Sequence, residues 1–210
     1  MTGTLPAHAQ ALGVTLSGSV IAVPTGQRTD HARLLTAEGH WVHADRIEGS
    51  YRGQAGVSLP EIRGFANLPD IRLDVHLMVD DILSDLDKLP GHGIDRVTLQ
   101  SDGRDDLTEL VSRAREHASE VWLALHTGSI QVTDLRETGA DGVLVMLTPP
   151  GQPGHQADLN QLSLVRVACH HDWPVGVDGG VTAANLDPIN EAGAVYAVAG
   201  RSLTQEAVNR

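Results

Sequence analysis

The sequence predicts an α/β protein built as a single (β/α)8 barrel of the TIM-barrel class over residues 1–210. Short β-rich runs alternate eight times with amphipathic stretches, which indicates parallel strands joined by right-handed crossovers. Three helical stretches end in glycine immediately before a strand, at Gly39, Gly139 and Gly193. Glycine takes the left-handed conformation after a helix at low steric cost. Eight strands in 210 residues favour a compact closed barrel with few insertions.

In the first half of the chain, residues 1–13 are expected to form an N-terminal extension. β-rich runs predict strands over 16–23, 40–46, 72–78 and 95–100, and amphipathic patterns predict helices over 29–38 and 80–89. Residues 48–68 are the least regular, with four glycines and Pro60, and are expected to hold a loop and a short helix. The run Pro24-Thr25-Gly26-Gln27 is no dinucleotide fingerprint, which argues against an open doubly wound sheet.

The same alternation continues through the second half of the chain. Strands are expected over 121–126, 142–147, 175–178 and 194–199. Helices are expected over 104–118, 130–138, 159–170, 183–192 and 203–209. Each strand is thus followed by a helical stretch, as a barrel requires.

Charge and cysteine content exclude several classes of protein. Lys and Arg number 15 against 27 Asp and Glu, a net charge of −12, so we expect neither nucleic acid nor a membrane as a partner. No uncharged apolar stretch approaches the ~20 residues of a membrane helix. Residues 1–13 lack the pattern of a secretion signal. The single Cys169 excludes an internal disulfide framework, and we expect a cytoplasmic domain.

Polar residues near the ends of three predicted strands form a candidate metal site. His43 and Asp45 lie two apart in one strand, so both point to the same side. His76 lies near the end of the third strand, and Asp178 ends the seventh. Two imidazoles and two carboxylates at the mouth of a barrel suit a divalent metal. Individually, a histidine in a strand is more often structural, Asp178 could cap a helix, and Asp74 could share the side of His76.

Glycine-bearing turns after the last two strands form a candidate phosphate site. Gly179 and Gly180 follow the seventh strand, and Gly200 and Arg201 follow the eighth. Backbone N–H groups and a helix N-terminus favour an anion there, and Arg201 adds a charged fork. The alternative is two ordinary tight turns. Residues 148–156 have no helical pattern and are expected to form a loop that closes over a ligand, or else a surface linker.

Five runs, in chain order over about residues 16–202, resemble motifs of ribulose-phosphate 3-epimerases. Residues 73–79 (LDVHLMV) contain that family's DVHLMV run, and residues 177–181 (VDGGV) match its VDGGI run. Residues 42–49 resemble its HxDxMDG segment, residues 144–156 its LVMTVxPGxGGQ loop, and residues 198–201 its VAGS ending.

The resemblance implies an isomerase that interconverts D-ribulose 5-phosphate and D-xylulose 5-phosphate. It implies one divalent metal (Zn, Fe, Mn or Co) held by His43, Asp45, His76 and Asp178, with Asp45 and Asp178 as the acid and base. It also implies a homo-oligomer. The residues expected to contact the sugar phosphate are Ser19, His76, Met78, Met146, Gly151, Gly154, Gly179, Gly180, Gly200 and Arg201.

The chemistry of epimerisation suits these residue types. Inversion at carbon 3 removes a proton beside a ketone and returns one from the other face, so it needs one carboxylate on each side of the substrate. A divalent metal would stabilise the enediolate as its charge develops.

Departures from the family motifs leave two alternatives open. The family's MDG is Ile47-Glu48-Gly49 here, Gln100 stands where the fourth strand often ends in histidine, and Arg201 replaces a small hydroxyl residue. These positions belong to the walls that recognise the sugar. One alternative is therefore an epimerase of another ketose phosphate, for example a six-carbon one. The other is a non-catalytic paralogue that binds a sugar phosphate.

Overall fold

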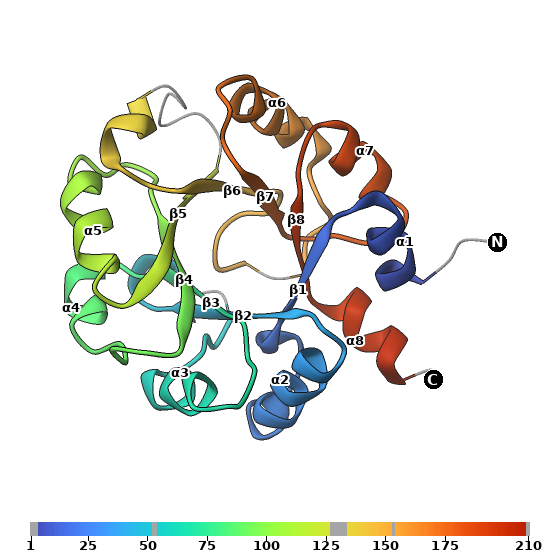
Figure 1. Cartoon of the computed structure of the whole chain (residues 1–210), viewed down its shortest axis with the longest axis horizontal. Coiled ribbons are helices and arrows are strands. Elements are labelled where there is room, and N and C mark those ends of the chain that lie inside the picture. The colour runs from blue at the N-terminus through green and yellow to red at the C-terminus, as the bar shows by residue number, and fades with distance from the viewer. Residues whose placement is uncertain (1–3, 52–53, 127–133, 153, 209–210) are drawn as a thin grey trace.

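Eight parallel strands close into a barrel in the order β1 to β8, with β8 paired to β1 (Figure 1). A computed structural model describes residues 4–51, 54–126, 134–152 and 154–208. The strands are β1 Thr15–Ser19, β2 Trp41–Ile47, β3 Leu73–Met78, β4 Ile94–Gln100, β5 Ala118–Leu125, β6 Gly142–Met146, β7 Val175–Asp178 and β8 Tyr196–Ala199. The predicted (β/α)8 barrel is confirmed.

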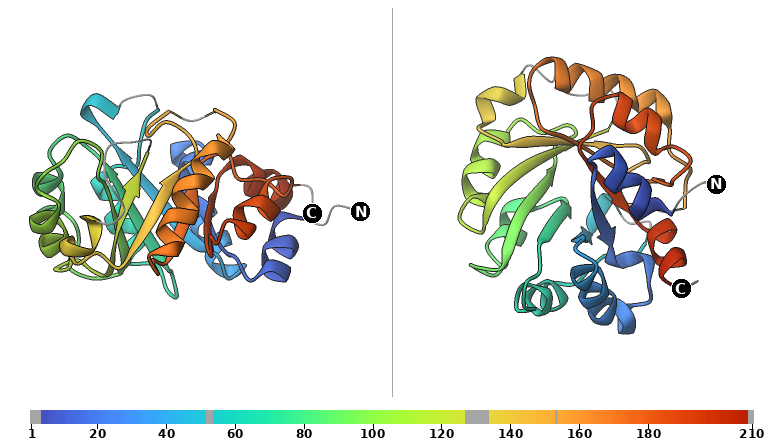
Figure 2. Two further views of the ribbon diagram at one scale, coloured as in Figure 1. Left: turned by 90° about the horizontal axis from the view of Figure 1, so that it is seen from above. Right: turned by 45° about the vertical axis from the view of Figure 1, so that its right-hand side comes forward.

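The helices surround the barrel, as the views in Figures 1 and 2 show. The α-helices are α1 Leu5–Leu12, α2 Arg28–Ala37, α3 Leu59–Ala66, α4 Ile82–Leu86, α5 Leu107–Ala114, α6 Leu162–His170, α7 Leu186–Glu191 and α8 Arg201–Val208. Short 3-10 helices are η1 Val20–Ala22, η2 Thr25–Gln27, η3 Gly49–Tyr51, η4 Asp134–Thr138 and η5 Leu159–Gln161. Among the described residues, we find no helix with the length and hydrophobicity needed to cross a membrane.

Local sequence explains how two of the helices begin and end. Within residues 1–13, α1 buries Leu5 and Ala9, ends at Gly13 with φ of 72°, and packs against α7 and α8. The short helix expected within residues 48–68 is α3, which begins with a capping box. Ser58 Oγ accepts the backbone N–H of Glu61, and the Glu61 carboxylate accepts the backbone N–H of Ser58.

The structure corrects three predicted boundaries. The first strand ends at Ser19, because residues 20–22 turn into η1, and an apolar run alone does not mark where a strand stops. Helix α5 begins only at Leu107, after a loop in which the Arg104 guanidinium donates to the carbonyls of Val79 and Asp80. Ala118 belongs to β5, since it pairs with Ile94 of β4. The helix expected over 130–138 lies partly outside the described residues, and its described part is η4.

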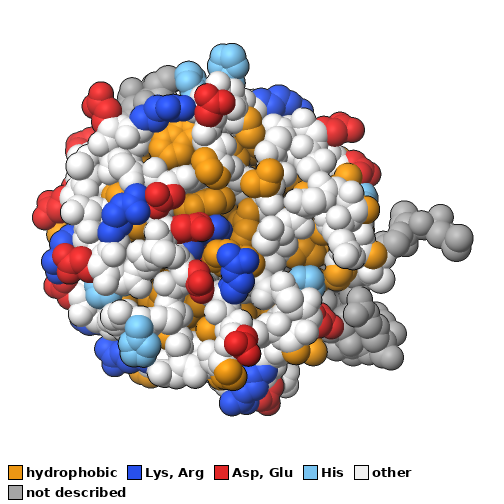
Figure 3. Space-filling model, in the orientation of Figure 1, with side chains coloured by type: hydrophobic (Ala, Val, Ile, Leu, Met, Phe, Trp, Pro, Cys, Tyr) orange, Lys and Arg blue, Asp and Glu red, His pale blue; other side chains and the backbone are white. Residues whose placement is uncertain are grey.

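Aromatic rings fill the barrel interior near the amino ends of the strands. Trp41, Trp122 and Tyr196 form part of a buried cluster separate from the main core. The Arg96 guanidinium carbon lies 4.5, 3.7 and 4.4 Å from the centres of these three rings. This layer leaves the carboxyl ends of the strands as the open end of the barrel. On the face drawn in Figure 3, hydrophobic side chains gather near the centre, and charged side chains of both signs lie around them.

Candidate active site

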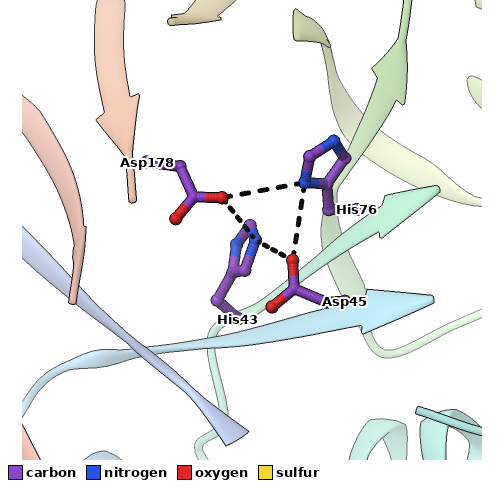
Figure 4. Close-up of side chains that lie close together, drawn as sticks. All are labelled: His43, Asp45, His76 and Asp178. Carbon is purple, nitrogen blue, oxygen red and sulfur yellow. Dashed lines mark hydrogen bonds and ion pairs between the residues drawn. The ribbon is translucent and has the colours of Figure 1, made fainter. Parts of the chain in front are cut away.

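Two histidines and two aspartates converge inside the carboxyl end of the barrel (Figure 4). His43 and Asp45 come from β2, His76 from β3, and Asp178 is the last residue of β7. One ligand atom from each of the four lies within 4.8 Å of the others. Asp45 Oδ1 lies 3.0 Å from His43 Nε2 and 3.5 Å from His76 Nδ1. Asp178 Oδ2 lies 3.9 and 4.0 Å from the same two nitrogens.

Strand geometry explains why these side chains meet. Alternate residues of a strand point to opposite faces, so His43 and Asp45 share one face of β2. The register pairs Asp45 with His76, which places them side by side on adjacent strands. The neighbours Val42 and Ala44 are fully buried in the main core around the barrel. The polar residues therefore occupy the inward positions of strands that are otherwise apolar.

Asp74 lies beside His43 on the adjacent strand and orients its ring. Asp74 Oδ2 lies 3.2 Å from His43 Nδ1, and it accepts the Tyr196 hydroxyl at 3.0 Å. The other carboxylate oxygen accepts the Thr98 hydroxyl at 2.8 Å. An ionised carboxylate only accepts hydrogen bonds, so His43 Nδ1 carries a proton and its Nε2 faces the other three side chains. Asp74 shares the inward side of β3 with His76, as the sequence left open, but it contacts His43.

His76 presents to the cluster a ring nitrogen that forms no hydrogen bond with the described residues. Its Nε2 lies 3.1 Å from Gln100 Oε1. Its Nδ1 is buried and forms no hydrogen bond with the part of the chain that the structure describes. A buried polar atom without a partner is costly, so this nitrogen is suited to a ligand between the carboxylates. The donor set of two imidazoles and two carboxylates fits a divalent transition metal.

The two aspartates of the cluster differ in acidity. Burial and the nearby charge of Asp45 raise the pKa of Asp178 to about 6, although His43 opposes this. Burial also disfavours ionisation of Asp45, but His43 and His76 outweigh it and hold the Asp45 pKa well below its usual range. Burial would lower the pKa of His43, yet the charges of Asp45 and Asp74 raise it well above its ordinary value. Separated carboxyl pKa values are typical of acid–base sites.

A cavity of about 420 Å³ opens above the cluster. Its size suits a small metabolite. It is lined by every residue predicted to contact substrate except His76, whose side chain is fully buried. These lining residues are Ser19, Met78, Met146, Gly151, Gly154, Gly179, Gly180, Gly200 and Arg201, together with Asp45 and Asp178.

The glycines of this cavity let three loops pack closely. Gly151 and Gly180 have φ of 71° and 64°. A Cβ added to Gly151 would lie 2.0 Å from the Tyr51 carbonyl oxygen, and one on Gly180 would lie 2.5 Å from the Ala157 nitrogen. The loop after β6 therefore packs against the loops after β2 and β7.

Other lining residues carry no recognisable sequence signal of their own. Gln54 donates to the Ile21 carbonyl at 2.9 Å and lines the cavity beside Ile21. Thr148, Gln152 and His155 also line it, and all three belong to the loop expected over residues 148–156. The sequence predicts that loop as a whole, but not which of its side chains line the cavity. No local pattern marks Gln54, because its place depends on how the loop after β2 folds back.

A barrel with paired carboxyls and imidazoles beneath a cavity is the arrangement of an enzyme that moves protons on a small molecule. The model of the ribulose-phosphate 3 epimerase family matches residues 16–204, and the chain belongs to that family. The expectation of an isomerase from the sequence motifs is confirmed by this membership.

Relatives and solved structures agree with this placement. The chain is 25 % identical to a ribulose-phosphate 3-epimerase of Mycobacterium leprae, over 91 % of this chain and 88 % of that protein. It is 27 % identical to the cytoplasmic isoform of a ribulose-phosphate 3-epimerase of Oryza sativa, over 81 % of this chain and 78 % of that protein. A phosphoribosyl anthranilate isomerase of Thermus thermophilus shares the fold, with 14 % identity and a TM-score of 0.65 over 94 % of this chain and all of that one.

Proposed function

We propose that this enzyme is a metal-dependent sugar-phosphate 3-epimerase that interconverts D-ribulose 5-phosphate and D-xylulose 5-phosphate. The convergence of Asp45 and Asp178 on one cavity carries the proposal, because they reach it from β2 and β7. Membership of the family and the names of the curated relatives support the same substrate pair.

Proton transfer is assigned to the two carboxyl groups. One of them takes the proton from carbon 3 of the substrate, and the other returns a proton to the opposite face. Their roles exchange when the reaction runs in reverse. In the metal-free site Asp45 stays ionised, while Asp178 holds a proton below about pH 6. A bound cation would displace that proton, so both carboxylates would be ionised until one of them takes the proton from carbon 3.

His43, Asp45, His76 and Asp178 would hold one divalent cation, Zn, Fe, Mn or Co, through His43 Nε2, His76 Nδ1 and one oxygen of each carboxylate. The unpartnered Nδ1 of His76 supports this assignment. When bound, the cation would stabilise the negative charge that develops on substrate oxygens once carbon 3 loses its proton.

The rest of the cavity is assigned to the sugar phosphate. Turns at Gly179, Gly180 and Gly200 offer backbone N–H groups to the phosphate, and Arg201 adds positive charge beside them. Local charge matters because the chain carries −12 overall and repels anions at long range. Met78 and Met146 supply apolar walls near the reacting carbons.

Deuterium exchange tests this function directly. The enzyme is incubated with ribulose 5-phosphate and a divalent metal in deuterated water, and NMR follows the label. We expect deuterium at carbon 3 and accumulation of xylulose 5-phosphate. Protein that holds about one metal per chain yet introduces no label would contradict the assigned substrate. A panel of other ketose phosphates, including six-carbon ones, would then identify a different epimerase, and turnover of none would indicate a binding paralogue.

We also propose a cytoplasmic homo-oligomer. The rice relative is named a cytoplasmic isoform, whereas an Arabidopsis thaliana relative is named chloroplastic. Light scattering coupled to size exclusion measures the mass in solution. A mass equal to the 22.3 kDa chain would contradict the assembly.

A further inference from the structure

A line of polar contacts runs from His76 away from the other metal ligands. Gln100 is the last residue of β4 and is fully buried. Its Oε1 lies 3.1 Å from His76 Nε2, and its Nε2 donates to a carboxylate oxygen of Asp102. The other oxygen of Asp102 accepts the backbone N–H of His126 at 3.3 Å. Asp102 is thus itself held by backbone, at the start of the loop after β4.

These contacts determine where the protons lie. An ionised carboxylate only accepts hydrogen bonds, so the NH2 group of Gln100 must face Asp102. The amide oxygen of Gln100 then faces His76, and an amide oxygen also only accepts. His76 Nε2 must therefore carry a proton. In the neutral ring this leaves the lone pair on Nδ1, the buried atom that points toward Asp45 and Asp178 without a hydrogen bond.

We propose that Gln100, oriented by Asp102, is a positioning residue that fixes the Nε2–H tautomer of His76 and thereby makes Nδ1 its metal-ligating atom. The inference rests on the metal site of the proposed function. It explains why the two histidines present opposite nitrogens to the cluster: Asp74 accepts from Nδ1 of His43, and Gln100 accepts from Nε2 of His76.

Removal of the acceptor should weaken metal binding. Partners of metal-bound histidines typically change metal affinity 10- to 100-fold when mutated. We therefore expect Gln100→Leu to raise the dissociation constant for Zn²⁺ and Mn²⁺ by roughly 10- to 100-fold, measured by competition with a chelator. Asp102→Asn should raise it less, because an Asn amide can either donate or accept. Asp102 is only partly buried, so Asp102→Asn should fold, and it can be used to test the proposal if Gln100→Leu fails to fold.

Two double variants separate a relay from independent effects. If Asp102 acts only through Gln100, then Gln100→Leu with Asp102→Asn should bind metal no more weakly than Gln100→Leu alone. Gln100→Glu with Asp102→Asn exchanges the amide and the carboxylate. It still offers an acceptor to His76 and a donor to residue 100, so we expect affinity close to that of the wild type. Additive losses, or no rescue by the exchange, would overturn the relay.

Ser101→Ala is the matched control. Ser101 is fully buried next to Gln100, and its hydroxyl donates to the Ala124 carbonyl at 2.6 Å. Loss of that bond should lower the unfolding temperature without changing the metal dissociation constant. A loss of metal affinity in Ser101→Ala equal to that in Gln100→Leu would mean that general destabilisation explains both, and would overturn the proposal.

The tautomer itself is measurable without metal or substrate. Nitrogen-15 chemical shifts of His76 are recorded in metal-free protein, at a pH about two units above the ordinary histidine pKa of ~6.5. We expect the Nε2–H form in the wild type and a mixture in Gln100→Leu. A dominant Nδ1–H form in the wild type would overturn the inference. Wild-type protein that binds no metal would instead overturn the proposed function, while the shifts would still decide whether Gln100 fixes the ring.

Discussion

The Ser19 hydroxyl donates to Asp45 Oδ2 at 2.7 Å, across the pair of strands β1 and β2. This bond holds one carboxylate oxygen, so the other oxygen faces His43 and His76. The serine expected to contact substrate therefore also orients Asp45, one of the two carboxylates to which proton transfer is assigned under the proposed function. Hydrogen bonds to charged groups contribute about 1.5–3 kcal/mol.

Ser19→Ala should lower kcat/KM roughly tenfold or more, since about 1.4 kcal/mol is a factor of ten and the bond is charge-assisted. Steady-state kinetics measures the loss. Ser19→Thr keeps a hydroxyl and serves as the control, with activity within a few-fold of the wild type. Equal activity of Ser19→Ala and the wild type would show that the hydroxyl does not orient Asp45 during turnover.

Asp178→Asn should abolish turnover but leave a folded barrel. Acid–base groups contribute about 10²- to 10⁴-fold to rate, so kcat should fall at least that far. The pKa of Asp178 is raised to about 6, so the carboxyl stabilises the fold only while protonated, and this contribution is lost as pH rises through 6. Metal-free Asp178→Asn should thus unfold at a higher temperature than metal-free wild type above about pH 6. Normal activity would contradict the acid–base role.

Metal affinity should fall as the pH drops below about 6. The Asp178 carboxyl then holds a proton that the cation must displace, which costs binding free energy. Because the pKa of His43 is raised, its ring also holds a proton that metal binding must release, and this second proton is still present at pH values above 6. Calorimetric titration in buffers of different ionisation enthalpy counts the protons released. Affinity that stays constant between pH 5 and 8 would contradict this assignment of the ligands.

Arg201→Ala should raise KM for the phosphorylated substrate roughly tenfold with a smaller change in kcat, because contacts to a distant phosphate bind substrate and transition state alike. Arg113→Ala is the control for net charge. Arg113 pairs with Asp87 and Glu116 on the surface and does not line the cavity. An unchanged KM in Arg201→Ala would place its guanidinium away from the phosphate.

Sequence periodicity is enough to predict the barrel, and polar residues near the ends of three predicted strands identify its four central side chains. Residues two apart on a strand share a face, so the spacing of His43 and Asp45 alone places them together. Contacts between side chains of neighbouring strands are not predictable in this way, because the register depends on both strands. The register pairs Asp74 with His43 and Thr98 with His76, and Gln100, two residues beyond Thr98, contacts His76 diagonally. The end of β1 escapes prediction for a similar reason, since residues 20–22 stay apolar after the strand stops.

The four clustered side chains are unevenly divided along the chain. Three come from β2 and β3 in the first half of the barrel, and Asp178 comes from β7 in the second half. A cation bound to all four would therefore link β7 to β2 and β3, across the two intervening strands β8 and β1. A ligand that binds only the folded state stabilises it by about 4 kcal/mol at a concentration 1,000 times its dissociation constant. If the proposed cation binds all four side chains, chelation would therefore lower the free energy of unfolding of the barrel as well as remove the ion proposed to act in epimerisation.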